Sequence, residues 1–181
     1  MEIIKLLALL IGSAIIFACC TAHPSPNLSY QEKAFRAHIF WQTEDISIGA
    51  VITSLPSLDP EQDEARSITL EFTAPESLLG ITVCKSGGEV TASLDGMEIS
   101  APHAERWLAI AELFDIEATV KESSIETLDG QKLNFIRAVS DDGKEFSLYL
   151  FPASGLPRRI CSEINGSPCT LEVISFEFIP D

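Results

Sequence analysis

A cysteine placed directly after an apolar N-terminal run is the residue of this sequence with the most easily assigned chemistry. Cys19 follows Ile16-Phe17-Ala18, and Leu6–Ala18 is an unbroken run of small or apolar residues. The run is shorter than the roughly 20 residues of a membrane span and suits the core of an export signal. A small residue at position 18 fits a signal peptidase pocket, and the thiol of Cys19 can accept a diacylglyceryl group. We predict that residues 1–18 are removed and Cys19 is lipidated, with an ordinary secretory signal or an uncleaved anchor as the alternatives.

The remaining cysteines are Cys84, Cys161 and Cys169. Thiols of an exported protein can oxidise to disulfides. Cys161 and Cys169 flank a turn-like segment, Ser162–Pro168, so two strands meeting there would bring them face to face. We predict a disulfide between Cys161 and Cys169, and the alternative is two small buried apolar side chains.

Residues that could bind metal or perform catalysis do not gather in the sequence. The acidic stretch Asp59–Glu64 lacks the central glycine and the distant glutamate of a calcium loop. His23, His38 and His103 are far apart and have no partners at ligand spacing. No serine lies in the context of a nucleophile elbow. We therefore predict a non-enzymatic protein without metal or cofactor.

The charge of the chain restricts its partners. Its 181 residues include 27 Asp and Glu against 12 Lys and Arg, which gives a net charge of -15. Such a surface is repelled by the phosphates of nucleic acids and by anionic lipid headgroups. The predicted partners are the membrane, through the lipid on Cys19, and either an apolar ligand or an envelope protein. The pair Arg158 and Arg159 could meet an anionic headgroup or form ion pairs with the abundant acids.

The chain divides into three parts. Residues 1–18 are the predicted lipoprotein signal peptide, and residues 19–30 are the lipidated cysteine and a tether with two prolines. Residues 31–181 are long enough for one domain with its own core. The protein is expected on the extracytoplasmic side of a membrane, held there by its lipid.

Alternation of apolar and polar residues with a period of two dominates the domain. Ile68–Thr73 is the clearest example, and turn signals such as Asp95-Gly96 and Asp142-Gly143 separate such runs. Short turns between strands favour an antiparallel meander. Pro102–Phe114 has helical spacing instead. We predict a mainly β (α+β) domain, with a curved antiparallel sheet forming an open half-barrel of about ten strands and one inserted helix.

Three segments, together with the export signal, resemble a known family. They are Ile68–Val83 with its Thr73-Ala74-Pro75 sequence, Leu94–Met97, and Gly155–Ile160, which opens a late hairpin with Gly-Leu-Pro. The pattern resembles the LolA/LolB-like lipoprotein-carrier superfamily, and most closely uncharacterised membrane lipoproteins of clostridial-type bacteria. The resemblance implies an open barrel with a helical lid around an apolar cavity, which holds acyl chains in characterised members. Those carriers are soluble or receive cargo at an outer membrane, so a carrier role does not transfer directly to a tethered chain.

Large apolar side chains on the predicted strands and helix are the candidates for ligand contact. They are Phe35, Ile39, Trp41, Phe72, Trp107, Ile110, Phe114 and Phe146. If they line a cavity, the protein is a membrane-anchored, non-catalytic lipoprotein that binds a lipid or another apolar ligand in its half-barrel. If they fill the barrel themselves, it is an envelope protein–protein interaction module. The volume left inside the barrel distinguishes these two functions.

Overall fold

The structure is a computed structural model that describes residues 28–43, 46–56, 66–101, 103–114, 118–164 and 166–180. The predicted signal peptide, Cys19 and the tether as far as residue 27 lie outside the described residues, as does the acidic stretch Asp59–Glu64. Among the described residues, no helix combines the length and the apolarity needed to cross a membrane.

Eleven strands form one antiparallel sheet with the order β6-β5-β4-β3-β2-β1-β11-β10-β9-β8-β7. The first half of the sheet consists of β1 (Phe35–Gln42), β2 (Ser47–Leu55), β3 (Ser67–Ala74), β4 (Ile81–Ser86), β5 (Glu89–Leu94) and β6 (Met97–Glu98). The second half consists of β7 (Ala118–Leu128), β8 (Gln131–Ser140), β9 (Glu145–Leu150), β10 (Pro157–Ile164) and β11 (Ser167–Phe178). The two halves are joined by pairing of β1 with β11.

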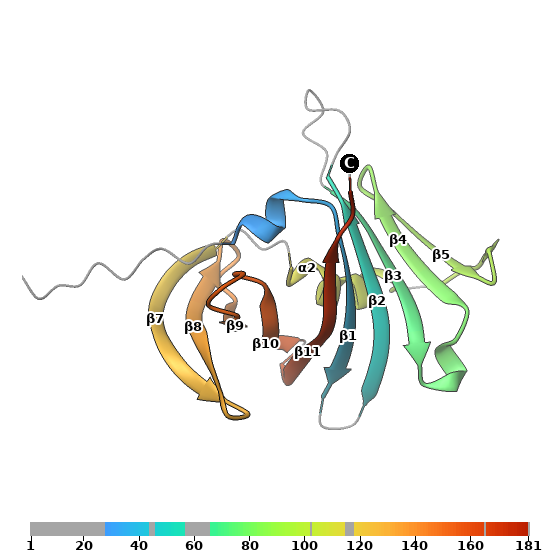
Figure 1. Cartoon of the computed structure of the whole chain (residues 1–181). Helices are drawn as coiled ribbons and strands as arrows, with labels where there is room; N and C mark the ends of the chain where they lie inside the picture. Colours follow the sequence, from blue (N-terminus) through green and yellow to red (C-terminus); the bar gives the residue numbers. More distant parts are fainter. Residues whose placement is uncertain are drawn as a thin grey trace, which may run out of the picture.

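The sheet curves around one helix, as Figure 1 shows. Its edge strands β6 and β7 are not paired with each other. This confirms the predicted open half-barrel. Its strands follow the sequence alternation: in β1, Phe35, Ala37 and Ile39 are buried and Arg36 and His38 are exposed. The alternating residues face opposite sides of the sheet, so one side is an apolar concave face.

Helix α2 (Glu105–Glu112) covers the middle of this concave face and packs against β3 and β4. Leu108, Ile110 and Ala111 are buried on its inner side. The Nζ atom of Lys85 on β4 lies 2.6 Å from Oε1 of Glu112, which fixes the end of the helix. The predicted helix extended over Pro102–Phe114, but its last two residues form a turn that continues the buried surface.

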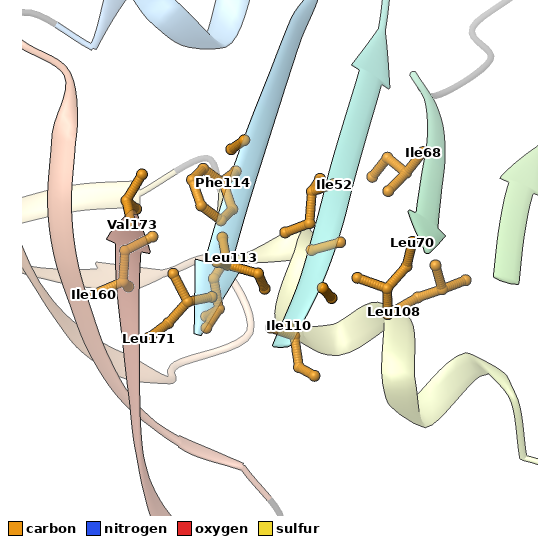
Figure 2. Packing of buried hydrophobic residues seen from close by; sticks show 14 of the residues in the cluster. Ile52, Ile68, Leu70, Leu108, Ile110, Leu113, Phe114, Ile160, Leu171 and Val173 are labelled. Carbon is orange, nitrogen blue, oxygen red and sulfur yellow. The ribbon is translucent and has the colours of Figure 1, made fainter. Parts of the chain in front are cut away.

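The core is continuous from β5 to β9 across the concave face. Figure 2 shows Leu108 of α2 beside Leu70 of β3, and Phe114 on the side of Val173 of β11. At one end of the barrel the short 3-10 helix η1 (Ser29–Glu32) adds Tyr30 to the same core. A second one, η2 (Glu76–Leu78), connects β3 to β4.

The convex face carries a smaller apolar cluster. Leu133 and Phe135 of β8 are buried there, outside the main core. The Phe135 ring lies 5.2 Å from that of Tyr149 on β9, measured between centroids. Strand β8 is therefore buried on both faces, and β9 is partly buried on its convex face.

Truncation of the core should be costly. We expect Leu70→Ala to lower the free energy of unfolding by about 2–5 kcal/mol, because Leu70 is fully buried against α2 and leaves a cavity. Urea unfolding of the full chain followed by circular dichroism measures this change. Ile125→Ala is the matched control, because Ile125 on β7 is 71% exposed and should change stability by about 0.5 kcal/mol or less. Equal losses in the two variants would contradict the position of α2.

Candidate functional site

The eight predicted ligand-contact residues all lie in or against the core of the concave face. Six are buried, and Trp41 and Trp107 are partly buried and pack against the same cluster. The structure therefore brings together strands and helix as the sequence indicated. Some of them contact one another: Phe35 lies 5.7 Å from Phe114, and Phe72 lies 4.9 Å from Trp107, between ring centroids.

Two residues that sequence analysis missed close one end of this core. Tyr30 is buried, with its ring 6.4 Å from that of Phe35 and 5.8 Å from that of Phe176. Arg66 donates hydrogen bonds to the carbonyl oxygens of Gln31 and Lys33, and to Oγ of Ser54 at 2.9 Å. Arg66 thus holds η1 over the barrel end. The sequence carries no signal for this, since Arg66 is far from Gln31 along the chain.

A notch opens in the sheet where β10 parts from β11. The β10–β11 ladder reaches Arg159 and Glu172, and β11 continues to Phe178 with β1 as its partner. A pocket of about 460 Å³ lies beside this free edge. We call it the seam notch; it is lined by Phe151, Leu156, Pro157, Arg158, Val173, Ile174, Ser175 and Phe176. It is mainly apolar, with one cationic side chain.

The two arginines of the predicted cationic pair share one carboxylate. Nη1 of Arg158 lies 2.5 Å from Oε2 of Glu172, and Nε of Arg159 donates to Oε1 of the same residue. Arg159 also lies 3.3 Å from Oδ2 of Asp129. The side chains of Arg158, Arg159 and Glu172 are largely buried and form an ion-pair network on the convex face. Arg158 extends this network to the seam notch.

The predicted disulfide is not formed: Cys161 and Cys169 are both free. The register places Cys161 opposite Thr170 and Cys169 opposite Ser162. Since neighbouring residues of a strand face opposite sides, the two thiols point to opposite faces of the sheet. Cys169 is buried on the concave side, close to the indole N–H of Trp41, which has no hydrogen bond of ordinary geometry. Cys169 is therefore a small buried apolar side chain, which was the alternative to the disulfide.

Neither cavity wall nor core gathers groups for catalysis. No group of three His, Cys, Asp or Glu residues that could hold a metal ion occurs in the part of the chain that the structure describes. The pKa of Asp142 is lowered to about 2 by hydrogen bonds from Lys144 and Ser140, but Asp142 lies in an exposed turn. This arrangement offers apolar surface and charge for binding.

Comparison with known proteins identifies similar folds. No family model and no curated protein sequence matches the chain. Among solved structures, an uncharacterized conserved protein from Thermus thermophilus is 18% identical, with a TM-score of 0.53, over 85% of this chain and 84% of that one. This likeness concerns the fold.

Two further neighbours are more distant. The Pseudomonas aeruginosa MucA/MucB complex contains a chain that is 12% identical, with a TM-score of 0.49, over 84% of this chain and 54% of that one. This chain therefore spans about half the length of that neighbour. LolA superfamily protein NE2245 from Nitrosomonas europaea is 12% identical, with a TM-score of 0.43, over 82% of this chain and 87% of that one. A LolA superfamily structure is thus among the neighbours, and the closeness to clostridial lipoproteins stays a prediction.

Cys169 should make stability depend on pH. Burial raises the pKa of its thiol from 9.0 to about 11, against a smaller opposite effect of Trp41. The folded chain keeps the proton at a pH where the unfolded chain loses it, so stability should fall as the pH rises from about 9 to about 11. Urea unfolding across this range measures the fall, and Cys169→Ala should show a flatter profile. Cys84→Ala is the control; if it flattened the profile as much, the assignment to Cys169 would be wrong.

Proposed function

We propose that this protein is a membrane-tethered, non-catalytic module on the extracytoplasmic side that binds an envelope polypeptide through its outer surfaces. One observation carries the proposal: side chains that would line a ligand cavity belong to a buried cluster with ring contacts between them, and α2 packs against β3 and β4. The interior thus serves as the core that stabilises the domain. Binding then depends on exposed edges and patches.

The tether follows from the N-terminal sequence. Lipidation of Cys19 would place the domain close to the membrane, with residues 20–27 as a spacer. A tether raises the effective concentration of the domain for partners in the same membrane. The net charge of -15 keeps the domain soluble and away from anionic headgroups, so the lipid is the attachment.

A second candidate function is binding of a small apolar ligand in the seam notch. Its volume of about 460 Å³ lies in the range of about 300–1,000 Å³ that is usual for ligand sites. Arg158 would face the anionic group of an amphipathic ligand, such as a fatty acid, while Val173 and Phe176 contact its chain. In contrast, a ligand among the eight core residues would compete with the ring contacts between them.

The first candidate is tested by fractionation and crosslinking of the full chain in an exporting bacterial host. We expect the wild-type protein in the membrane fraction, with a discrete crosslinked complex of defined mass. Cys19→Ala should move the protein to the soluble fraction and reduce the complex, because the tether no longer concentrates it. Cys84→Ala serves as the control for loss of a cysteine. An unchanged membrane fraction in Cys19→Ala would contradict the lipid tether, and absence of any complex would contradict the module.

The second candidate is tested by titration of a fluorescent fatty acid. We expect Ile174→Glu to abolish binding, since Ile174 lines the seam notch and is 67% exposed, so the new carboxylate repels the ligand without disturbing the core. Ile125→Glu places the same charge at an equally exposed site on β7 and should bind as the wild type does. Equal affinity of both variants would contradict the seam notch as the ligand site.

A further inference from the structure

We propose that the corner of the sheet formed by β4, β5 and β6 is the surface that binds the partner, and that the partner presents a cationic, amphipathic segment to it. This inference rests on the proposed function and names the site and the chemistry of the partner. We call the surface the corner patch. It consists of Leu79, Ile81, Leu94 and Met97.

The corner patch is a continuous row across the strands. Ile81 of β4 is the direct partner of Leu94 of β5, and Leu94 is the direct partner of Met97 of β6. Directly opposed residues face the same side of a sheet, so the three side chains lie next to one another. Leu79 precedes Gly80, whose carbonyl oxygen accepts a hydrogen bond from the Asp95 amide at 3.0 Å. Ile81, Leu94 and Met97 therefore form one surface, and Leu79 lies at its end, two residues before Ile81 in the chain.

The close approach of the two turns depends on Gly80. Its φ of +81° lies in the left-handed region, and a Cβ atom at this position would be 2.5 Å from Oδ1 of Asp95. Any side chain here would be strained by this backbone conformation and would displace the Asp95 carboxylate. The Cβ position of Gly80 also lies 3.4 Å from Cδ1 of Leu94, so the turn that carries Leu79 lies against Leu94.

The corner patch begins in the core and ends in solvent. Ile81 packs against the core on the same face as Val83, and α2 packs mainly against β3 and β4. Exposure rises along the row, with Leu94 38% exposed and Met97 69% exposed, and Leu79 is 50% exposed. Single exposed apolar residues are ordinary, whereas a contiguous exposed group of this kind is typical of an interaction site.

The charge around the corner patch indicates the chemistry of the partner. Residues 76–98 contain four carboxylates, Glu76, Glu89, Asp95 and Glu98, and a single cation, Lys85, which is paired with Glu112. None of the four carboxylates has an ion-pair partner among the described residues. Glu76, Asp95 and Glu98 are exposed at the rim of the corner patch. An apolar face flanked by Lys or Arg is complementary to this surface, and an anionic membrane is repelled by it.

The test uses a peptide of about 18 residues with leucine and lysine in heptad spacing, long enough to form an amphipathic helix on binding. Its dissociation constant for the full chain is measured by calorimetry. We expect the double variant Leu79→Ser and Met97→Ser to weaken binding about tenfold or more, because two large apolar contacts are lost. The double variant Glu76→Gln and Glu98→Gln should weaken binding and reduce its dependence on salt.

The controls separate the corner patch from general attraction to an acidic protein. Ile125→Ser and Glu122→Gln on β7 should bind the peptide as the wild type does. A scrambled peptide of the same composition should bind more weakly. Equal weakening by the β7 variants, or equal binding of a leucine and glutamate peptide, would overturn the proposal. Binding of the full chain to phosphatidylcholine vesicles that is lost in Met97→Ser would also overturn it, in favour of a membrane surface.

Site-specific crosslinking in the host separates failure of this inference from failure of the proposed function. A photoreactive residue replaces Met97 in one variant and Ile174 in another. A complex formed from position 97 supports the corner patch when the peptide data agree. A complex formed from position 174 alone keeps the interaction module and overturns the corner patch, and no complex from either position overturns both.

Discussion

The structure depends on one constraint: the concave face of a curved, open sheet is apolar and must be covered by the same chain. Helix α2 covers the middle of this face, Phe114 continues the cover to β1, and Tyr30 closes one end. One short helix cannot span eleven strands. The outer strands are therefore less protected, and Ile125 on β7 and Met97 on β6 remain exposed. The buried centre of the concave face and the exposed edges thus have the same origin.

The proposed function places binding at the surface of the domain. Moving α2 away from the sheet would expose buried apolar side chains at about 25 cal/mol per Å², a cost that any internal ligand would have to offset. The seam notch avoids this cost, because it arises where β11 extends beyond the β10 ladder. The corner patch avoids it as well, since its side chains already lie in solvent. Both sites are products of strands that differ in length from their neighbours.

The distribution of charge differs between the corner patch and the rest of the sheet. Most of the few cations are engaged: Arg158 and Arg159 share Glu172, and Lys85 binds Glu112. These pairs neutralise the acids nearest to the sheet seam and to α2. The carboxylates around the corner patch have no such partners among the described residues, so an apolar surface and unneutralised negative charge coincide there. Such a combination favours binding of a partner with cations around an apolar face.

The sequence by itself determined the antiparallel sheet, the inserted helix and the eight residues of the core, because hydrophobic periodicity reports which face of an element is buried. Only the tertiary structure decides whether these buried side chains line a cavity or fill it. Whether Trp107 and Phe114 line a cavity or fill it depends on where α2 lies against β3 and β4, which local patterns do not encode. The two free thiols likewise depend on strand register, which local patterns do not encode. A shift of one residue in the register puts Cys161 and Cys169 on opposite faces of the sheet. Arg66 and Tyr30 meet only because η1 folds over the barrel end, and such contacts between distant segments exist only in the folded chain.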